Sequence, residues 1–300
     1  MAASGLDLVG ANLFRRAITL AASSMLVAAV AACSSGSPEG VTTAPPGSSA
    51  PALGHVHGLG VDPADGTLYV ASHTGVYRLA ANGSADRVAD RYQDTMGFAV
   101  VGPGNFLASG HPDLREDLPG QLGLIESKDS AKTWTAVSLQ GKADFHAIEP
   151  AGRRTYAYDS VNGALITSTN RRDWTVMENQ ELLDLAADPS HPRVLFATTP
   201  EGQVLRSEDG SKLTPVTGAP RLGPLDWQTD GPLVGVGADG TVSVSSDEGA
   251  TWAKKGTVAG QVEALDVIPG RWHVATDRGI YESTDDGQTW MPVLVATTNH

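Results

Sequence analysis

The sequence predicts an all-β protein, a six-bladed β-propeller, from three observations. A segment of about forty residues recurs from near residue 53 to the C-terminus. Each copy contains four short apolar runs separated by Gly, Pro and Asp turns, which is typical of strands. No segment beyond residue 52 has the apolar spacing of a helix. Four strands in about forty residues match one propeller blade, so six copies predict six blades.

A turn motif marks five of the six copies. Its last two occurrences read SSDEGATW and STDDGQTW, and the first copy of the repeat keeps only its strand and Gly, in GVYRLAANGSAD. The motif begins at five serines that are 41, 39, 38 and 38 residues apart: Ser127, Ser168, Ser207, Ser245 and Ser283. Because apolar runs flank it, we interpret the motif as the hairpin between the third and fourth strands of a blade.

The acidic residues of this motif are predicted to be structural. An Asp in a turn accepts hydrogen bonds from backbone amides, and the Gly adopts a positive φ. In one copy Asn170 replaces the Asp, which a turn tolerates and a catalytic carboxylate would not. We therefore assign structural roles to Asp129, Asp209, Asp247 and Asp285.

The first 33 residues resemble a bacterial lipoprotein signal. Arg15 and Arg16 precede an apolar run that is short for a membrane span, and VAAC, ending at Cys33, resembles a lipobox. The resemblance implies a signal peptide at residues 1–32, lipidation of Cys33 and an extracytoplasmic protein anchored to the cell membrane. An ordinary secretory signal with a chance Cys is the alternative. Residues 33–52, rich in Ser, Pro and Gly, predict a flexible tether before a propeller at 53–300.

Composition narrows the range of partners. Asp and Glu number 34 against 21 Lys and Arg, which gives a formal net charge of −13. Such a chain is poorly suited to bind phosphate backbones, so we expect no nucleic-acid partner. Cys33 is the only cysteine, so the predicted propeller contains no disulfide and depends on packing for its stability.

The histidines predict a candidate ligand site at one end of the central channel. In a propeller, the connections from second to third strands share one channel end with the connections between blades, and the turn motifs lie at the opposite end. Ligand sites favour the end away from the turn motifs. Five histidines fall there: His55, His57, His73, His111 and His146. The other three, His191, His273 and His300, are predicted to lie elsewhere.

Carboxylates accompany these histidines in the predicted connections. The candidates are Asp94, Asp113, Asp144 and Asp159. Imidazole and carboxylate together suit a divalent transition metal or acid–base chemistry. The same side chains could instead cap strands and satisfy channel amides. Metal or ligand binding, structural satisfaction and catalysis therefore remain open. The one long insertion, residues 109–123, is interpreted as a recognition loop or a harmless surface excursion.

Several phrases resemble known families. SxDxGxTW resembles the Asp box of the BNR repeat. HVHGLGVDPADGTLYVASHTGVYRL, GHPD and ADFHAI resemble bacterial envelope proteins labelled glycosyl hydrolases by similarity to sialidases and sortilin-type propellers. More loosely, the chain resembles the propeller of photosystem II assembly factors. These resemblances imply an envelope-protein or glycan partner. The Arg-Ile-Pro segment of sialidases is absent, and Arg78, Arg91, Arg115 and Arg153 are not placed as a carboxylate-binding triad.

The sequence therefore predicts a binding module whose His-rich channel end holds a ligand, a partner or a divalent transition metal. The alternative is a glycoside hydrolase that uses two of the four candidate carboxylates, which needs a pair of carboxylates about 5 to 10 Å apart.

Overall fold

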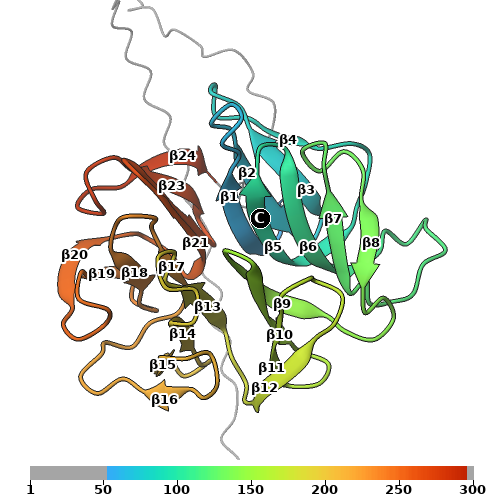
Figure 1. The fold of residues 1–300 in the computed structure, drawn as a ribbon. Helices are drawn as coiled ribbons and strands as arrows, with labels where there is room; N and C mark the ends of the chain where they lie inside the picture. Colours follow the sequence, from blue (N-terminus) through green and yellow to red (C-terminus); the bar gives the residue numbers. More distant parts are fainter. Residues whose placement is uncertain (1–52, 296–300) are drawn as a thin grey trace, which may run out of the picture. The chain divides into compact units, whose positions relative to one another are not determined.

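Six antiparallel four-stranded sheets make up residues 53–295, the part of the chain that the computed structural model describes (Figure 1). Each sheet consists of four strands that follow one another in the chain. The sheets form the blades of a ring, so the predicted six-bladed β-propeller is confirmed. The predicted signal peptide, Cys33, the tether and His300 lie outside the described residues.

The candidate histidines lie on or next to strands of the first three blades. Blade 1 contains β1 (Val56–Val61), β2 (Leu68–Ser72), β3 (Gly75–Leu79) and β4 (Ala85–Arg87). Blade 2 contains β5 (Asp94–Gly102), β6 (Asn105–His111), β7 (Leu124–Ser127) and β8 (Thr135–Ser138). Blade 3 contains β9 (Phe145–Ala151), β10 (Arg154–Asp159), β11 (Ala164–Ser168) and β12 (Thr175–Asn179).

The last three blades repeat the pattern with shorter strands. Blade 4 contains β13 (Asp184–Ala187), β14 (Leu195–Thr198), β15 (Val204–Ser207) and β16 (Thr214–Pro215). Blade 5 contains β17 (Leu225–Trp227), β18 (Leu233–Val236), β19 (Thr241–Ser245) and β20 (Ala253–Thr257). Blade 6 contains β21 (Val262–Ile268), β22 (Arg271–Thr276), β23 (Gly279–Ser283) and β24 (Met291–Val295).

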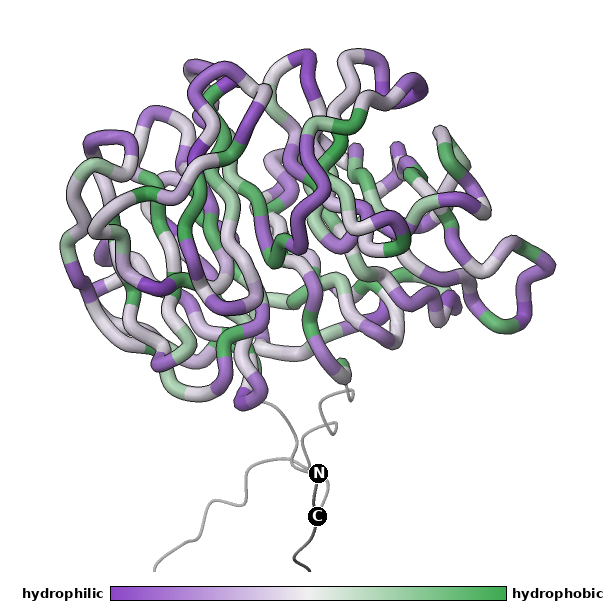
Figure 2. The backbone as a smooth tube through the Cα atoms, turned by 90° about the horizontal axis from the view of Figure 1, so that it is seen from below, coloured by the Kyte–Doolittle hydropathy of each residue, from purple (hydrophilic) through white to green (hydrophobic). Residues whose placement is uncertain are grey.

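The hydrophobic core is divided among the six interfaces between neighbouring blades, which we call seams. Each seam has its own cluster of buried apolar side chains, such as Tyr69 and Phe106 between blades 1 and 2. Figure 2 shows hydrophobic and hydrophilic stretches alternating along the chain, with many hydrophilic segments at the turns. Both faces of a middle strand are covered by neighbouring blades, which explains runs such as Tyr69–Val70–Ala71 that are wholly buried.

The turn motif connects the third and fourth strands of blades 2 to 6, as predicted. In blade 6, the Ser283 hydroxyl donates to Oδ1 of Asp285 at 2.9 Å and accepts the amide of Gly287 at 3.0 Å. Asp285 also accepts the amide and hydroxyl of Thr289, at 2.9 and 2.7 Å. The same bonds recur around Asp129 and Asp247, while Asp209 accepts only from Ser211. These contacts agree with a structural role for the four acidic residues.

The first strands of the blades line the central channel. β1, β5, β9, β13, β17 and β21 each contact the next around the ring, and β21 contacts β1. No strand is exchanged between the first and last blades, because β1 and β24 each belong to a sheet of four consecutive strands. Within residues 53–295 no helix is long and apolar enough to span a membrane.

Candidate functional site

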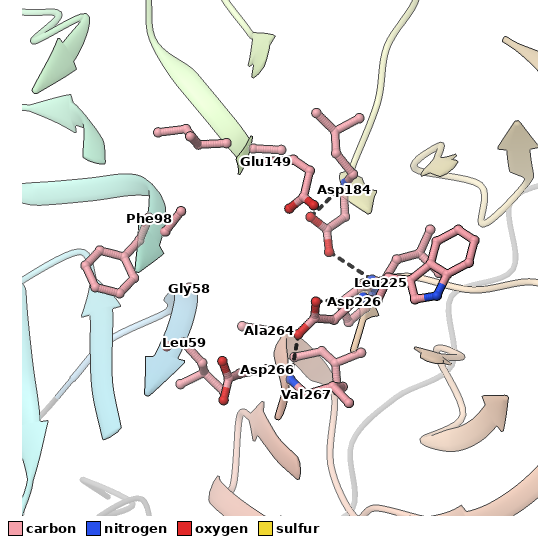
Figure 3. A pocket seen from close by; sticks show the side chains of 18 of the residues that line it. Gly58, Leu59, Phe98, Glu149, Asp184, Leu225, Asp226, Ala264, Asp266 and Val267 are labelled. Atoms are coloured by element: carbon pink, nitrogen blue, oxygen red, sulfur yellow. Dashed lines mark hydrogen bonds between the residues drawn. The ribbon is translucent and has the colours of Figure 1, made fainter. Parts of the chain in front are cut away.

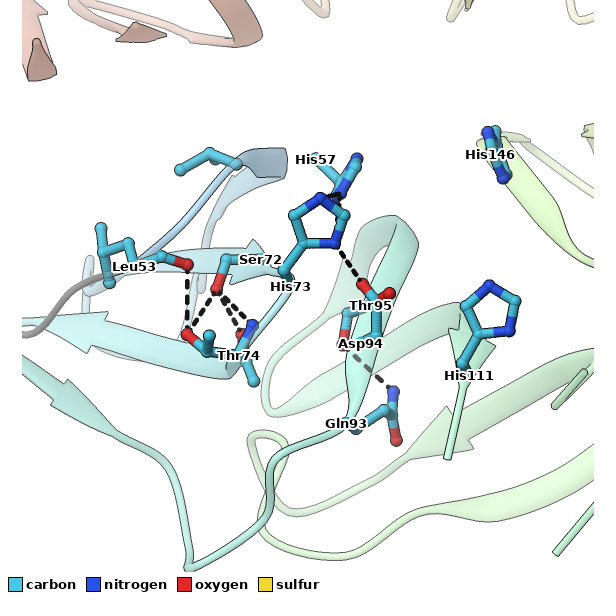
Figure 4. A network of polar contacts seen from close by, with 12 residues as sticks. Leu53, His57, Ser72, His73, Thr74, Gln93, Asp94, Thr95, His111 and His146 are labelled. Carbon is cyan, nitrogen blue, oxygen red and sulfur yellow. Dashed lines mark hydrogen bonds and ion pairs between the residues drawn. The ribbon is translucent and has the colours of Figure 1, made fainter. Parts of the chain in front are cut away.

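The five candidate histidines lie at one end of the channel, which we call the mouth: His55, His57, His73, His111 and His146. His55 and His57 stand at the start of β1, and His73 lies in the turn between β2 and β3. His111 ends β6, and His146 follows the first residue of β9. Figure 4 shows His57 and His73 close together, with His111 and His146 facing them from the neighbouring strands. Residues up to 91 positions apart in sequence, His55 and His146, thus share one mouth, because the second-to-third and interblade connections end there.

Three histidines of blade 1 form a tight group. The ring centroids of His55 and His57 are 4.7 Å apart, and those of His57 and His73 are 4.4 Å apart. Nε2 of His57 lies 3.4 Å from both ring nitrogens of His73. Two nitrogens that bind one tetrahedral metal ion with bonds of about 2.0–2.1 Å are separated by about 3.4 Å. The two imidazoles are therefore spaced as two ligands of a single ion.

Carboxylates orient two of these rings. Oδ1 of Asp94, the first residue of β5, lies 2.9 Å from Nδ1 of His73. Oε1 of Glu263 in β21 lies 3.0 Å from Nδ1 of His55. A carboxylate on one ring nitrogen fixes the tautomer and leaves the other nitrogen, Nε2, to bind a metal. Together, His57 Nε2, His73 and Asp94 Oδ1 bring three potential ligand atoms within 4.8 Å of one another.

The protonation of this group favours metal binding. Burial, together with the neighbouring His55 and His73, lowers the pKa of His57 to about 3. His57 is therefore a neutral imidazole at neutral pH, the form that binds metals. The hydrogen bond that His55 donates to the carboxylate of Glu263 raises the pKa of His55. The two histidines, although only two residues apart in the sequence, thus play different electrostatic roles.

A second group forms on blades 2 and 3. Oδ2 of Asp144 lies 3.0 Å from Nε2 of His146 and 3.5 Å from Nε2 of His111. The other nitrogen of His111, Nδ1, lies 2.8 Å from the carbonyl oxygen of Gly120 in the long insertion. Asp144 also affects the pKa of His57, so the two groups share the mouth electrostatically.

The remaining two candidate carboxylates are held by other groups. Asp113 pairs with Arg115, at 2.6 Å between Oδ2 and Nη2, and accepts the amide of Tyr92 at 2.8 Å. The hydrogen bond from Arg115 holds the pKa of Asp113 well below its usual range. Asp159 accepts the backbone amide of Asp144 and the side-chain amide of Asn162. Both carboxylates therefore stabilise loops at the mouth through these hydrogen bonds.

The long insertion, residues 109–123, packs through its polar residues. Arg115 bridges Asp113 and Asp90 and lies 4.9 Å from the centroid of the Tyr92 ring. Leu114, between Asp113 and Arg115, is fully exposed. The described interactions of this segment reach the connection between blades 1 and 2, through Arg91 and Asp90, and also blade 3, where the Ser109 hydroxyl accepts the amide of Phe145 at 2.9 Å.

Two other described histidines, His191 and His273, lie away from the mouth. His273 is buried in β22 between Asp266 and Glu282, at 3.0 and 3.1 Å. His191 lies in the turn between β13 and β14, where Nδ1 is 3.0 Å from Asp188. His191 and Asp188 form, with Glu248, the other group among the described residues that could hold an ion. Glu248 is already paired with Arg206 at 2.7 Å.

The channel below the mouth contains acidic residues, three of which the sequence interpretation missed: Asp184, Asp226 and Asp266. A cavity of about 990 Å³ is lined by first-strand residues, including Glu149, Asp184, Asp226 and Asp266 (Figure 3). Burial raises the pKa of Asp184 to about 6 and, with repulsion from Asp266, that of Asp226 to about 8. Burial also raises the pKa of Glu149 well above its ordinary value.

These acids bond neighbouring blades together. Glu149 accepts the amide of Ala187 in the next first strand, Asp184 that of Leu225, and Asp226 that of Val267. A sequence signal existed for three of the four acids. Asp184, Asp226 and Asp266 each follow Leu and precede an apolar residue in a predicted first strand, 42 and 40 residues apart. An acidic residue that recurs about once every forty residues, at the same place in an otherwise apolar first strand, indicates a side chain that faces the channel.

Comparison with known proteins supports the fold alone. No family model matches the chain, and no curated protein matches it as a relative. A chain of the crystal structure of a nidogen/laminin complex is similar, with a TM-score of 0.59 and 11% identity over 75% of this chain and 91% of that one. The structure of YCF48 bound to D1 peptide gives a TM-score of 0.53 and 15% identity over 81% and 83%.

A third similar structure is the extracellular domain of the putative hybrid two component system BT4673 from B. thetaiotaomicron. Its TM-score is 0.55 at 11% identity, over 83% of this chain and 34% of that one. Fold and comparisons together define the class, a six-bladed β-propeller with a histidine-lined mouth.

Proposed function

We propose that this protein is a binding module that holds a divalent transition-metal ion at the mouth of its propeller. The observation that carries the proposal is the 3.4 Å separation of Nε2 of His57 from Nε2 of His73. Asp94, on Nδ1 of His73, supplies the outer-sphere carboxylate that accompanies metal-binding histidines. His55 lies beside them as a further imidazole. Neutral imidazoles suit zinc, copper or nickel better than calcium or magnesium.

Binding is better supported than glycoside hydrolysis. A glycosidase needs one carboxylic acid that keeps its proton until it protonates the leaving group. Of the four candidate carboxylates, Asp113 has a lowered pKa and an arginine partner, and Asp159 is engaged with amides. Asp94 and Asp144 each contact histidines. Two of the structurally similar chains come from complexes, a nidogen/laminin complex and YCF48 bound to D1 peptide, which is consistent with a propeller used for binding.

The same proposal includes the cellular setting. The lipobox-like sequence at Cys33 supports a lipoprotein anchored to the outer face of the cell membrane, and the turn motif supports membership of the Asp-box propellers. An envelope protein or a glycan is then the expected partner. A bound metal at the mouth would be presented to that partner.

Metal analysis of the purified protein, without a His tag or chelator, tests the proposal. After exposure to Zn²⁺ and removal of excess, we expect at least one tightly bound equivalent by elemental analysis. His57→Ala with His73→Ala should lose the ion bound at the blade 1 histidines, because both inner ligands are removed. Asp94→Asn should weaken binding at that position about 10- to 100-fold, as other outer-sphere changes do.

A matched variant on the opposite face controls for adventitious binding. His191→Ala removes the histidine of the Asp188 group and should leave the bound Zn²⁺ unchanged. Circular dichroism and thermal unfolding would verify that each variant is folded. If the parent binds no metal, or if only His191→Ala loses it, the proposed function is wrong.

A further inference from the structure

Arginines gather on one part of the face opposite the mouth, which we call the underside. The turn motifs lie on the underside, and those of blades 4, 5 and 6 each carry two adjacent acidic residues, at 208–209, 247–248 and 285–286. Blade 3 and the first turn of blade 4 differ from this pattern and carry five arginines: Arg153, Arg154, Arg171, Arg172 and Arg193. In a chain with a formal net charge of −13, this local positive charge indicates a surface that attracts anions.

Two turns that carry these arginines touch at the seam between blades 3 and 4. A Cβ on Gly152, in the turn between β9 and β10, would lie 3.4 Å from the ring of Pro192, in the turn between β13 and β14. The hydroxyl of Tyr156 in β10 also donates to the carbonyl oxygen of Pro192 at 2.8 Å. The residues next to these contacts form what we call the arginine patch: Arg153, Arg154 and Arg193.

Two side chains of the arginine patch lie near the same tyrosine. The guanidinium carbon of Arg154 is 5.8 Å from the centroid of the Tyr156 ring, and Nη1 of Arg154 donates to the hydroxyl of Thr167 at 3.2 Å. Burial raises the pKa of Tyr156, and the positive charges of Arg154 and Arg193 oppose that rise. The two guanidinium groups, 39 positions apart in sequence, therefore act on one place at the seam.

The charges of the arginine patch are not neutralised by the protein. Within residues 53–295 none of its three members takes part in an ion pair, whereas Arg206 in the same blade as Arg193 pairs with two glutamates. Acidic side chains of the neighbouring turns are engaged elsewhere. Asp209 accepts the amide and hydroxyl of Ser211, and Asp188 lies 3.0 Å from His191. Two members of the patch are exposed and the third is half-buried, so an external anion can reach them.

The chemistry of the patch favours a glycan over a protein as the source of that anion. A guanidinium group binds carboxylate or phosphate oxygens through two parallel hydrogen bonds. Protein partners, by contrast, bury aromatic or aliphatic side chains at the centre of an interface. None of the exposed large apolar side chains of residues 53–295 lies in the two turns of the patch. The acidic turns of blades 4 to 6 would repel a long polyanion, so a short charged stretch fits best.

We propose that the arginine patch is a second binding surface, which takes a glycan that carries carboxylate or phosphate groups. Arg153 and Arg193 bind the anionic groups directly, while Arg154, held by Thr167 and Tyr156, adds positive charge at the edge of the seam. This surface lies on the face opposite the mouth and shares no residue with the proposed metal site. The propeller can therefore hold an acidic glycan and a metal ion at the same time.

Titration calorimetry of the full-length protein with defined polysaccharides tests this inference. The probes are a short oligogalacturonate, which carries carboxylates, a phosphomannan, which carries phosphates, and uncharged dextran. We expect at least one acidic glycan to bind, more weakly as salt is added, and dextran not to bind. Arg153→Glu with Arg193→Glu should raise the Kd at least about tenfold, because hydrogen bonds between charged groups are lost.

A matched variant separates the patch from net charge. Lys254→Glu with Lys255→Glu makes the same change of charge at exposed positions of β20 in blade 5 and should leave the Kd within about twofold of the parent value, since distant exposed charges are screened. Arg153→Gln with Arg193→Gln is a milder variant at the patch, in case the double Glu variant does not fold. Thermal unfolding verifies the fold of each variant.

The outcomes decide the inference apart from the metal site. Binding that is lost in the patch variants and kept in the lysine variant supports it, and the tighter probe shows whether carboxylate or phosphate is preferred. No binding of either acidic glycan, or an equal loss in both kinds of variant, overturns it. Tighter binding of an oligoglutamate with matched charge overturns the choice of a glycan. His57→Ala with His73→Ala should bind the glycan as the parent does, and a loss there would place the glycan at the mouth instead.

Discussion

At the residue scale, some aspartates of this fold are ionised at neutral pH and others keep their proton, although the side chain is the same. In the turn of blade 6, hydrogen bonds from Thr289 lower the pKa of Asp285 to about 2. In the channel, burial and the nearby Asp266 raise the pKa of Asp226 to about 8. Exposed hydrogen-bond donors stabilise the ionised form, whereas burial removes the water that solvates it. The position in the blade therefore decides whether an aspartate is charged at neutral pH.

The raised pKa of Asp226 predicts a pH-dependent stability. An unfolded aspartate titrates near pH 3.9, so between about pH 4 and 8 the folded protein binds a proton that the unfolded chain does not. The free energy of unfolding should therefore fall as pH rises through this window, by up to about 1.4 kcal/mol per pH unit for one proton. Urea unfolding from pH 6 to 8 measures this slope.

Two variants test whether Asp226 causes this pH dependence of the unfolding free energy. With Asp226→Asn, the free energy of unfolding should fall less steeply between pH 6 and 8. A change in stability that is the same at every pH does not affect this slope. Asp184→Asn is the matched control, because the pKa of Asp184 is about 6 and its contribution ends near that pH. An unchanged slope in Asp226→Asn would show that this residue is ionised in the folded protein.

At the element scale, the seams use two kinds of contact between first strands. Carboxylates of β9, β13 and β17 accept amides of the next first strand, and Glu263 of β21 accepts the amide of Val56 at 3.0 Å. The other two seams contain glycines instead. A Cβ on Gly60 of β1 would lie 2.6 Å from Val100, and one on Gly97 of β5 would overlap the carbonyl oxygen of Phe145 in β9. Glycine permits the strands to approach closely there.

Two glycines of β5 test this close approach. Gly97→Ala should destabilise the protein by about 1–3 kcal/mol, because a backbone carbonyl cannot move aside as a side chain can. Gly102→Ala, in the same strand, meets nothing within 4 Å and should change stability by less than about 1 kcal/mol. Chemical denaturation measures both. Equal effects of the two substitutions would refute the packing explanation.

The elements show what the sequence could and could not predict. Runs such as Val262–Ile268 and the spacing of the turn motif predicted strand order and blade number, because each blade repeats the same local pattern. The convergence of His73 and His111 also followed from the topology. Their ring orientations did not, since these depend on Asp94 and on the carbonyl of Gly120. Such contacts join segments whose relative placement no local pattern specifies.

At the scale of the whole molecule, the chain enters the propeller beside the mouth. The carbonyl oxygen of Leu53 accepts the hydroxyl of Thr74, the neighbour of His73, at 3.1 Å. The predicted tether, residues 33–52, would therefore enter the propeller on the face that carries the histidines. The predicted lipid anchor would hold the whole propeller through this one attachment.

The predicted anchor can be tested in cells. Cys33→Ala removes the only thiol that a lipid could modify, so the protein should move from the membrane fraction to the soluble or secreted fraction. Fractionation and immunoblotting would measure this shift. The soluble variant should still bind Zn²⁺, since all proposed ligands lie between residues 55 and 146. Retention of the variant in the membrane fraction would contradict lipidation at Cys33.

Closure of the ring gives the molecule a particular way to unfold. Five stretches of backbone join the blades in order, but no such stretch joins blades 6 and 1. Their seam is held by the cluster around Val56, Tyr77 and Ile280 and by contacts such as the hydrogen bond that Glu263 accepts from the amide of Val56. In an open array, end repeats can fray alone. Here every blade covers two others, so losing one exposes apolar faces on both sides. Opening should begin at the single seam without a peptide link and then proceed cooperatively through the ring.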